Sequence, residues 1–210
     1  MAISAELRQR AISGVALGSA VLFITWWSAG SFAAMCVLGA VILCKEWLGM
    51  TRQRSHGFFL AGLAYILAGC AGLVYLRVEN LHILFALFAI VWTGDIAGYL
   101  FGKRFGKHKI APAISPGKSW EGLAGSVVVS AIIGAVLGSV APVPHAILGA
   151  LFAVLGLGGD MFESAVKRKA GIKDSGSLIP GHGGLFDRVD ALLPCAIFAA
   201  VALYIRLNLQ

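Results

Sequence analysis

Acidic residues gather in the second half of the chain, where they alternate with basic residues and glycines. Seven of the ten Asp and Glu residues lie between residues 95 and 190. They are Asp95, Glu121, Asp160, Glu163, Asp174, Asp187 and Asp190. The stretch 164–190 combines three of these acids with several Lys and Arg residues and the glycine-rich turn 180–184. Mg²⁺ takes one or two carboxylates and fills its shell with phosphate oxygens and water. The mixture therefore predicts a site for a metal-bound polyphosphate.

A second motif places ionisable residues inside an apolar segment. Asp160 and Glu163 are three residues apart in the sequence GGDMFES, and Lys167 follows on the same helical stripe. An ionisable residue within a membrane span costs about 2.5–3.5 kcal/mol on insertion scales, so such residues are functional candidates. The alternative interpretation is a salt-bridge seam inside the helix bundle.

The stretch 101–122 is also basic, and it contains the sequence Gly117-Lys118-Ser119. A phosphate-binding P-loop would need a glycine five positions before Gly117, but Pro112 stands there and no strand is predicted before it. A P-loop is therefore rejected. Ser115–Lys118 is predicted to contact a phosphate or a lipid headgroup, and Lys103–Lys109 fits a loop at the lipid surface equally well.

The composition indicates what positions these residues. Apolar residues make up 59 % of the 210 residues and charged residues 13 %, against about 25 % charged in a soluble domain. This excludes a soluble, disordered or nucleic-acid-binding chain. A spanning helix needs about 20 mostly apolar residues. Seven segments qualify: 11–28, 31–48, 57–76, 81–101, 122–141, 145–166 and 191–207. The predicted fold is an all-α polytopic transmembrane bundle of about seven spans with two cytoplasmic loops.

The basic residues test this count. Seven alternating spans place fifteen of the 17 Lys and Arg residues on one face and leave Arg77 and Arg206 on the other. Lys and Arg gather on the cytoplasmic side, so we expect a cytoplasmic N-terminus and an external C-terminus. The first apolar run is longer than the core of a signal peptide, which favours a retained anchor. We expect one domain over 1–210, with supporting helices over 1–80 and a catalytic part over 81–210.

The stretch 164–190 resembles the phosphatidate cytidylyltransferases, also called CDP-diacylglycerol synthases. The residues that carry the resemblance are Ser164, Lys167-Arg168, Lys173-Asp174, His182-Gly-Gly184 and Asp187-Arg188-Val-Asp190. Upstream elements of the family are matched by Asp95-x-x-Gly-Tyr99, by Ser115-Pro-x-Lys118-Ser-Trp-Glu-Gly122 and by Gly159-Asp160-x-x-Glu-Ser164. The Glu46-Trp47 pair extends the similarity toward the N-terminus. Many members have eight or nine spans, so this chain departs from the family in its N-terminal half.

The resemblance implies transfer of CMP from CTP to phosphatidate, giving CDP-diacylglycerol and pyrophosphate for phospholipid biosynthesis. It implies Mg²⁺ held by Asp160 and Asp187, and it allows a second cation such as K⁺. Two cations bridging the phosphates would reduce the repulsion between anionic substrates. It also implies a homodimer and a bacterial-type inner membrane, with the active site on the cytoplasmic side and no nucleic acid as partner.

The same resemblance assigns roles to individual residues. The predicted catalytic residues are Asp160, Asp187, Lys167, Arg168, Lys173, His182 and Arg188. The predicted substrate-binding residues are Asp95, Ser115, Lys118, Glu121, Glu163, Ser164, Asp174, Gly183, Gly184 and Asp190. Two alternative functions are weighed against this one. A CTP-dependent polyprenol or lipid kinase would transfer the γ-phosphate instead. A transporter is disfavoured because the acids cluster on one membrane side and no inverted repeat is present.

Overall fold

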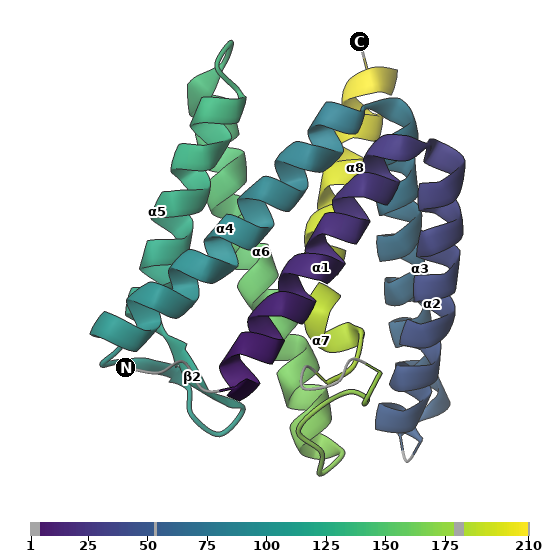
Figure 1. Cartoon of the computed structure of the whole chain (residues 1–210), viewed down its shortest axis with the longest axis vertical. Helices are drawn as coiled ribbons and strands as arrows, with labels where there is room; N and C mark the ends of the chain where they lie inside the picture. The colour runs from purple at the N-terminus through teal and green to yellow at the C-terminus, as the bar shows by residue number, and fades with distance from the viewer. Residues whose placement is uncertain (1–4, 53, 179–182, 210) are drawn as a thin grey trace.

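The computed structural model of the chain describes residues 5–52, 54–178 and 183–209. Seven long helices account for most of this part. They are α1 (Ala5–Trp27), α2 (Ala29–Thr51), α3 (His56–Glu79), α4 (Leu81–Phe105), α5 (Trp120–Leu137), α6 (Pro142–Lys169) and α8 (Leu192–Asn208). A short helix α7 (Phe186–Val189) and two strands, β1 (Lys109–Ala111) and β2 (Ser115–Ser119), lie between them. Each long helix overlaps one predicted apolar segment, which confirms the all-α bundle (Figure 1).

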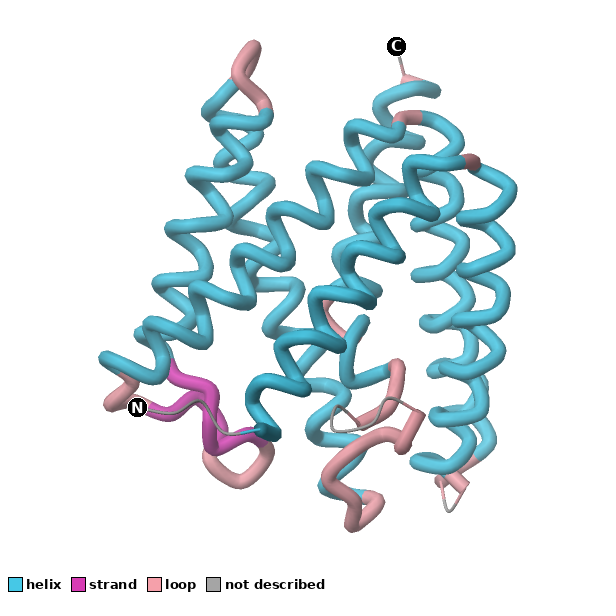
Figure 2. The backbone as a smooth tube through the Cα atoms, in the orientation of Figure 1, coloured by secondary structure: helices cyan, strands magenta, loops and turns pink. Residues whose placement is uncertain are grey.

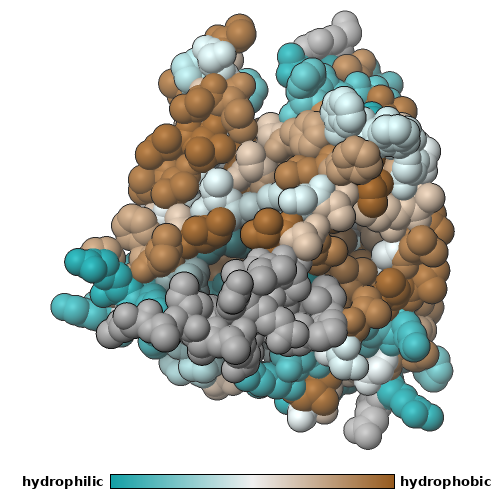
Figure 3. All heavy atoms as spheres, viewed as in Figure 1, coloured by the Kyte–Doolittle hydropathy of each residue, from teal (hydrophilic) through white to brown (hydrophobic). Residues whose placement is uncertain are grey.

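The helices have the length and composition of membrane spans. Helices α2 to α6 are each long and apolar enough to cross a bilayer, and residues 14–27 and 192–208 form shorter apolar helices. The surface in Figure 3 is largely brown along the flanks of the helices and teal near their ends, as the two solvents of a membrane protein require. The chain is therefore a multi-pass membrane protein, and seven remains the predicted number of spans.

Local sequence explains where several helices begin. Ser28, Ser55, Asn80 and Ser119 stand at the N-caps of α2, α3, α4 and α5, and each side chain accepts a backbone N–H of the first turn. These short polar side chains satisfy amides that have no partner within the helix. Helix α6 begins instead with Pro142, whose missing N–H costs nothing in the first turn.

The bundle packs as two groups of helices. The largest interfaces join α4 to α5, α5 to α6, α2 to α3, and α3 to α8. A side chain at Gly149 of α6 would overlap the backbone carbonyl of Ser130 in α5, so the two helices approach as closely as small residues allow. Around the other group, Trp47 of α2 is fully buried, and its ring stacks on Phe186 at 6.1 Å. This packing ties the N-terminal helices to the segment that follows α6.

The polar connections lie at one end of the bundle. In Figures 1 and 2 the strands, α7 and the loop after α6 occupy the lower end, where α1 also begins, whereas α8 ends at the top. The stretch predicted as a plain loop after α4 contains an antiparallel pair, with Lys109 opposite Ser119 and Ala111 opposite Ser115. The turn is closed by the Ile114 N–H, which donates to the Ala111 carbonyl at 3.1 Å. Helices α4 and α6 also run four and three residues beyond their predicted ends at 101 and 166, toward the same side.

Candidate active site

The central feature of the site is a lysine shared by two carboxylates. Lys167, near the end of α6, donates to Glu163 Oε2 at 2.7 Å and to Asp187 Oδ1 in α7. The three side chains are almost inaccessible to solvent, with 10 %, 1 % and 9 % of their surfaces exposed. The pair Glu163–Lys167 forms because residues four apart share one face of a helix. The structure thus joins the predicted α6 motif to the predicted Asp-Arg-x-Asp motif.

Asp187 is fixed from a second direction by the loop that precedes it. Its Oδ2 accepts the N–H of Ser175 at 2.9 Å, the Ser175 hydroxyl at 2.9 Å and the N–H of Gly184 at 2.8 Å. Burial opposes ionisation of this carboxyl, but Lys167 and the two amides outweigh burial and lower its pKa to about 2. Asp187 is therefore a carboxylate held in one orientation at neutral pH.

The described part of the predicted glycine turn contacts Asp187. The sequence predicts amides free to bind phosphate, whereas the Gly184 amide binds Asp187. Gly183 has φ +80°, a left-handed conformation that favours glycine, and a Cβ there would stand 2.6 Å from Asp187 Oδ2. The described glycines therefore let the chain wrap closely around its own carboxylate. The predicted catalytic residue His182 lies outside the described residues.

A second lysine–carboxylate pair joins the strands to α6. Lys118 of β2 contacts Asp160 Oδ2, and the Ser164 hydroxyl donates to Asp160 Oδ1 at 3.3 Å. Burial disfavours the ammonium, but Asp160 outweighs burial and raises the pKa of Lys118. This pair is more open than the first, with 37 % and 22 % of the side chains exposed. The two acids of the α6 motif therefore have different partners, because Asp160 pairs with Lys118 and Glu163 pairs with Lys167.

The Lys118–Asp160 pair adjoins a cavity of about 530 Å³ between α4, α5 and β2. Lys118, Lys103 and Lys109 line it, together with Asp95 and the small residues of the facing helices. Its volume falls in the ordinary range for a small-molecule site. Asp95 lines this cavity and is exposed. Ionisable residues within spanning helices usually face such a polar cavity. Three lysines suit the cavity to an anionic group.

Asp190 completes the acidic lining around Lys118. Its Oδ1 accepts the N–H of Ala191 at 2.8 Å, and Asp95, Asp160 and Asp190 all act electrostatically on Lys118. Burial, and next the nearby Asp160 carboxylate, raise the pKa of Asp190 to about 7. Counting Glu163 and Asp187, five carboxyl groups here face the two ammonium groups of Lys118 and Lys167. The centre therefore carries an excess of acid.

The donor set fits a hard cation that completes its shell with ligands from the substrate. Glu163 Oε1 is fully buried and has no hydrogen-bond partner among the described residues, so a carboxyl oxygen without a donor lies next to the Lys167 that also pairs with Asp187. Across residues 5–52, 54–178 and 183–209, no three His, Cys, Asp or Glu side chains converge as an all-protein cage would require. Mg²⁺ is commonly held by one or two carboxylates plus phosphates and water, and this arrangement matches that pattern.

Other predicted site residues lie farther from the acidic centre and bind the loops. Arg168 donates to the carbonyls of Ile114 and Ile172, both at 3.2 Å, and so connects the strands to the loop after α6.

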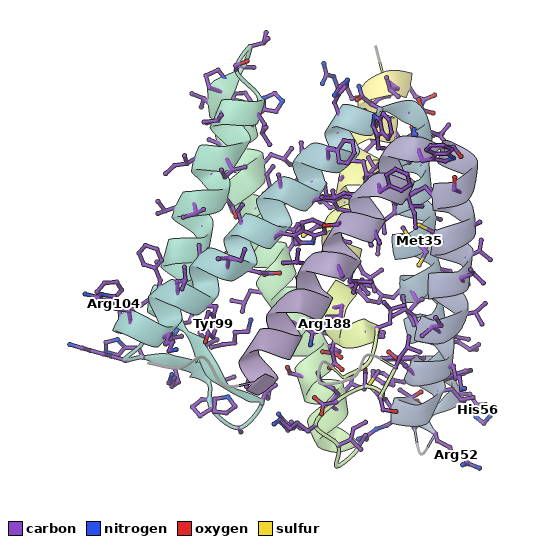
Figure 4. The ribbon with its side chains drawn as sticks, viewed as in Figure 1. Met35, Arg52, His56, Tyr99, Arg104 and Arg188 are labelled. Carbon is purple, nitrogen blue, oxygen red and sulfur yellow. The ribbon has the colours of Figure 1, made fainter. Side chains whose placement is uncertain are left out.

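The remaining predicted residues are spread along the same loops. At the start of α5, Glu121 Oε1 lies 2.7 Å from His108 Nδ1. Ser115 begins β2, whereas Lys173 and Asp174 are exposed in the loop after α6. Figure 4 shows Arg188 at the same lower end of the bundle as Tyr99 and Arg104.

Sequence reasoning missed one group that contacts this site. Glu46, near the end of α2, accepts the N–H groups of Leu185 and Phe186 at 2.9 and 2.8 Å and the Ser175 hydroxyl at 3.0 Å. From the sequence, Glu46 is identified only as part of the Glu46-Trp47 pair that extends the family resemblance, and it is assigned no role in the site. The partners of Glu46 are mainly backbone amides, and because every residue except proline has one, the sequence does not indicate which amides Glu46 binds.

Comparisons with known proteins show which family and which relatives the chain resembles. A model of the cytidylyltransferase family matches residues 52–206. A Mycobacterium bovis protein named phosphatidate cytidylyltransferase is 35 % identical, over 89 % of this chain and 68 % of its own length. A Brucella suis protein of the same name is 31 % identical, over 91 % of each chain. A Mycobacterium leprae protein of that name is 41 % identical over 70 % of this chain.

The shares of length covered differ between these relatives. The chain spans 49 to 68 % of the mycobacterial proteins but 91 % of the Brucella protein. The family model covers the residues from α3 to α8, including both lysine–carboxylate pairs, the strands and the loop around Asp187. Since both the match to the family model and the match to the Brucella suis relative extend over most of the sequence, the chain belongs to the cytidylyltransferase family.

Proposed function

We propose that the protein transfers CMP from CTP to phosphatidate, giving CDP-diacylglycerol and pyrophosphate. The relatives named phosphatidate cytidylyltransferase support this proposal. The observation that carries it is the pairing of Lys118 and Asp160 beside a cavity that holds two further lysines. A cationic cavity next to an acidic centre suits a reaction in which anionic phosphates must meet despite their repulsion.

In this proposal the basic and the acidic residues have different roles. Lys118, with Lys103 and Lys109, would hold phosphate oxygens in the cavity that these lysines line. Asp160 and Asp187, which now pair with lysines, would hold Mg²⁺. The bound cation would neutralise phosphate charge as pyrophosphate leaves. An oxygen of phosphatidate attacks the α-phosphorus of CTP, and the bond from that phosphorus to pyrophosphate breaks. A phosphate monoester is already largely ionised at pH 7, so the chain need not supply a strong base. Catalysis by positioning and charge then suffices.

We further propose that this chemistry takes place at the cytoplasmic face of a bacterial inner membrane. The strands, α7 and the loop after α6 share one end of the bundle with the start of α1 (Figure 1). The positive-inside rule assigns that end to the cytoplasm, where CTP is available. A homodimer, and a second cation such as K⁺, are included in the proposal because the family resemblance implies them.

One observation favours a second candidate, a CTP-dependent lipid kinase. A kinase must remove a proton from a neutral hydroxyl, and a general base works best with a pKa near the working pH. Asp190 has its pKa raised to about 7 and lies in the acidic centre. The three lysines of the cavity argue for an anionic acceptor instead, since a neutral alcohol needs no such charge.

Labelled CTP separates the two functions. Purified protein in detergent–phosphatidate micelles with Mg²⁺ should place the label of α-labelled CTP in the lipid product. The label of γ-labelled CTP should appear in pyrophosphate. Diacylglycerol or a polyprenol, as acceptor controls, should remain unlabelled. Label from γ-labelled CTP in the lipid, with release of CDP, would establish the kinase and reject cytidylyl transfer.

A further inference from the structure

Glu46 of α2 lies far in sequence from the acidic centre but supports it directly. Its Oε1 accepts the Leu185 N–H at 2.9 Å, and its Oε2 accepts the Phe186 N–H at 2.8 Å and the Ser175 hydroxyl at 3.0 Å. An ionised carboxylate only accepts hydrogen bonds, and here both oxygens have donors. Only 9 % of the residue is exposed, so water competes little for these contacts.

The contacts of Glu46 reach Asp187 by two routes. Leu185 and Phe186 immediately precede Asp187, so fixing their amides fixes the backbone from which the Asp187 side chain departs. Ser175 binds Glu46 through its hydroxyl and Asp187 Oδ2 through both its N–H and its hydroxyl. A hydroxyl has one proton to donate. The Ser175 N–H therefore keeps Asp187 in place whenever the hydroxyl turns to Glu46.

The loop is built to admit this carboxylate. A Cβ at Gly184 would stand 2.6 Å from Glu46 Oε1, and one at Gly176 would stand 2.8 Å from the same atom. Both distances are shorter than side chains tolerate, and neither glycine has a positive φ. Gly176 is thus explained by the approach of Glu46, and Gly184 by the approach of both Glu46 and the Ser175 hydroxyl, rather than by an unusual backbone conformation.

We propose that Glu46 is a positioning residue for the reaction, acting through Ser175, Leu185 and Phe186 to orient Asp187. The kinetic part of this proposal rests on the proposed cytidylyl transfer. The described contacts of Glu46 are with Ser175, Leu185 and Phe186, and Glu46 precedes residue 52, where the match to the family model begins. Helix α2 therefore belongs to the working part of the enzyme, although the sequence assigns it to the supporting helices.

The substitution Glu46→Gln tests this role because it keeps the size of the side chain. One carboxylate oxygen becomes an NH₂ group, which cannot accept from Leu185 or Phe186. Partners that orient a ligand carboxylate typically contribute 10–100-fold to activity. We expect kcat and kcat/KM for CTP to fall together by about that factor, with KM nearly unchanged. The matched control is Glu79→Gln, the same change at an exposed carboxylate at the end of α3, which should leave both constants unchanged.

Hydrogen exchange measured by mass spectrometry reads the contact without reference to any substrate. Peptides covering residues 183–190 should exchange faster in Glu46→Gln, whereas peptides from α4, α5 and α6 should keep their protection. Ser175→Ala should produce a smaller kinetic loss. The double variant should lose less than the product of the single losses, because both changes remove the same contact.

Each outcome has a defined meaning. Wild-type kcat together with wild-type exchange in Glu46→Gln would overturn the proposal. Faster exchange across every helix in both Glu46→Gln and Ser175→Ala would also overturn it, because Glu46 would then stabilise the whole fold. If the wild-type protein does not transfer label from α-labelled CTP, the proposed function fails. The exchange at 183–190 still decides in that case whether Glu46 holds the loop.

Discussion

The two lysine–carboxylate pairs use the same chemistry in different surroundings. Lys167 is enclosed, with a tenth of its side chain exposed, and is shared between Glu163 and Asp187. Lys118 has more than a third of its side chain exposed, pairs with Asp160 and lines a cavity. A buried pair is costly to break because the remaining charge has no solvent, whereas an exposed pair exchanges partners readily. Under the proposed function, the difference separates a lysine that holds the site together from one that is available to a substrate.

The largest expected effect comes from removing the carboxylates of the two pairs. Asp187→Asn and Asp160→Asn should each lower CMP transfer by about a thousandfold, the order found when a group that stabilises transition-state charge is lost. The α-labelled CTP assay at saturating Mg²⁺ measures this. Gel filtration in detergent should show both variants folded. Activity near wild type in either variant would remove that residue from the proposed metal site and leave only one of the pairs functional.

Replacing each lysine by methionine sharpens the comparison in opposite directions. Lys167→Met leaves Glu163 and Asp187 without their shared counter-charge, which should destabilise the protein by about 3–5 kcal/mol. Lys118→Met should change stability little but raise KM for CTP or phosphatidate, because its charge faces the cavity. Thermal melting in detergent and substrate titrations measure the two effects. Equal losses of stability in both variants would contradict the distinction between a structural and a substrate-facing lysine.

Two glycine substitutions probe the same contrast through the backbone. An added Cβ at Gly184 would collide with the Ser175 hydroxyl and stand 2.6 Å from Glu46 Oε1. Among the residues that the structure describes, nothing lies within 4 Å of an added Cβ at Gly117, in the strand that carries Lys118. Gly184→Ala should therefore lower the melting temperature by several degrees, the shift that about 1–2 kcal/mol produces in a protein of this size. Gly117→Ala should leave the melting temperature unchanged, and a drop there would show that the strand end is packed more tightly than its open surroundings indicate.

The remaining expected effect is on the pH dependence of stability. The pKa of Asp190 is raised to about 7 in the fold, against about 3.9 in an unfolded chain. Its contribution to stability is therefore complete below pH 4 and is lost as the pH rises toward 7 and the folded carboxyl ionises. Asp190→Asn should remove this contribution, so its melting temperature should fall less between pH 5 and pH 7 than that of wild type. Parallel curves for the two proteins would show that Asp190 titrates normally.

The sequence predicts the helices well because membrane spans can be identified from their apolar composition. All seven predicted segments correspond to long helices, since about 20 apolar residues suffice to identify each. The ends of α4 and α6 were missed by a few residues because Lys103, Arg104 and Lys167 read as loop. These helices extend past their apolar parts. The strands were missed because two prolines and several lysines hide a short hairpin pattern.

The candidate site was predicted as a set of residues but not as a set of contacts. Motif spacing identifies Asp160, Glu163 and Asp187, yet it does not show that Lys118 takes Asp160 and leaves Lys167 for the other two. Partners 42 and 20 residues apart in sequence are set by helix packing, which spacing does not encode. Glu46 was missed for a stronger reason, because most of its partners are backbone amides.

The long sequence separation between Glu46 and its partners also has a consequence for the synthesis and membrane insertion of the protein. Its amide partners lie 139 and 140 residues farther along the chain. At synthesis rates of about 5–20 residues per second, Glu46 leaves the ribosome roughly 7–30 s before those amides exist. During that interval α2 enters the membrane with a carboxylate whose final partners are absent, so the acidic centre is assembled only after α7 has emerged. A ribosome stalled after α6 would therefore carry a chain with most of its spans in place but no competent centre.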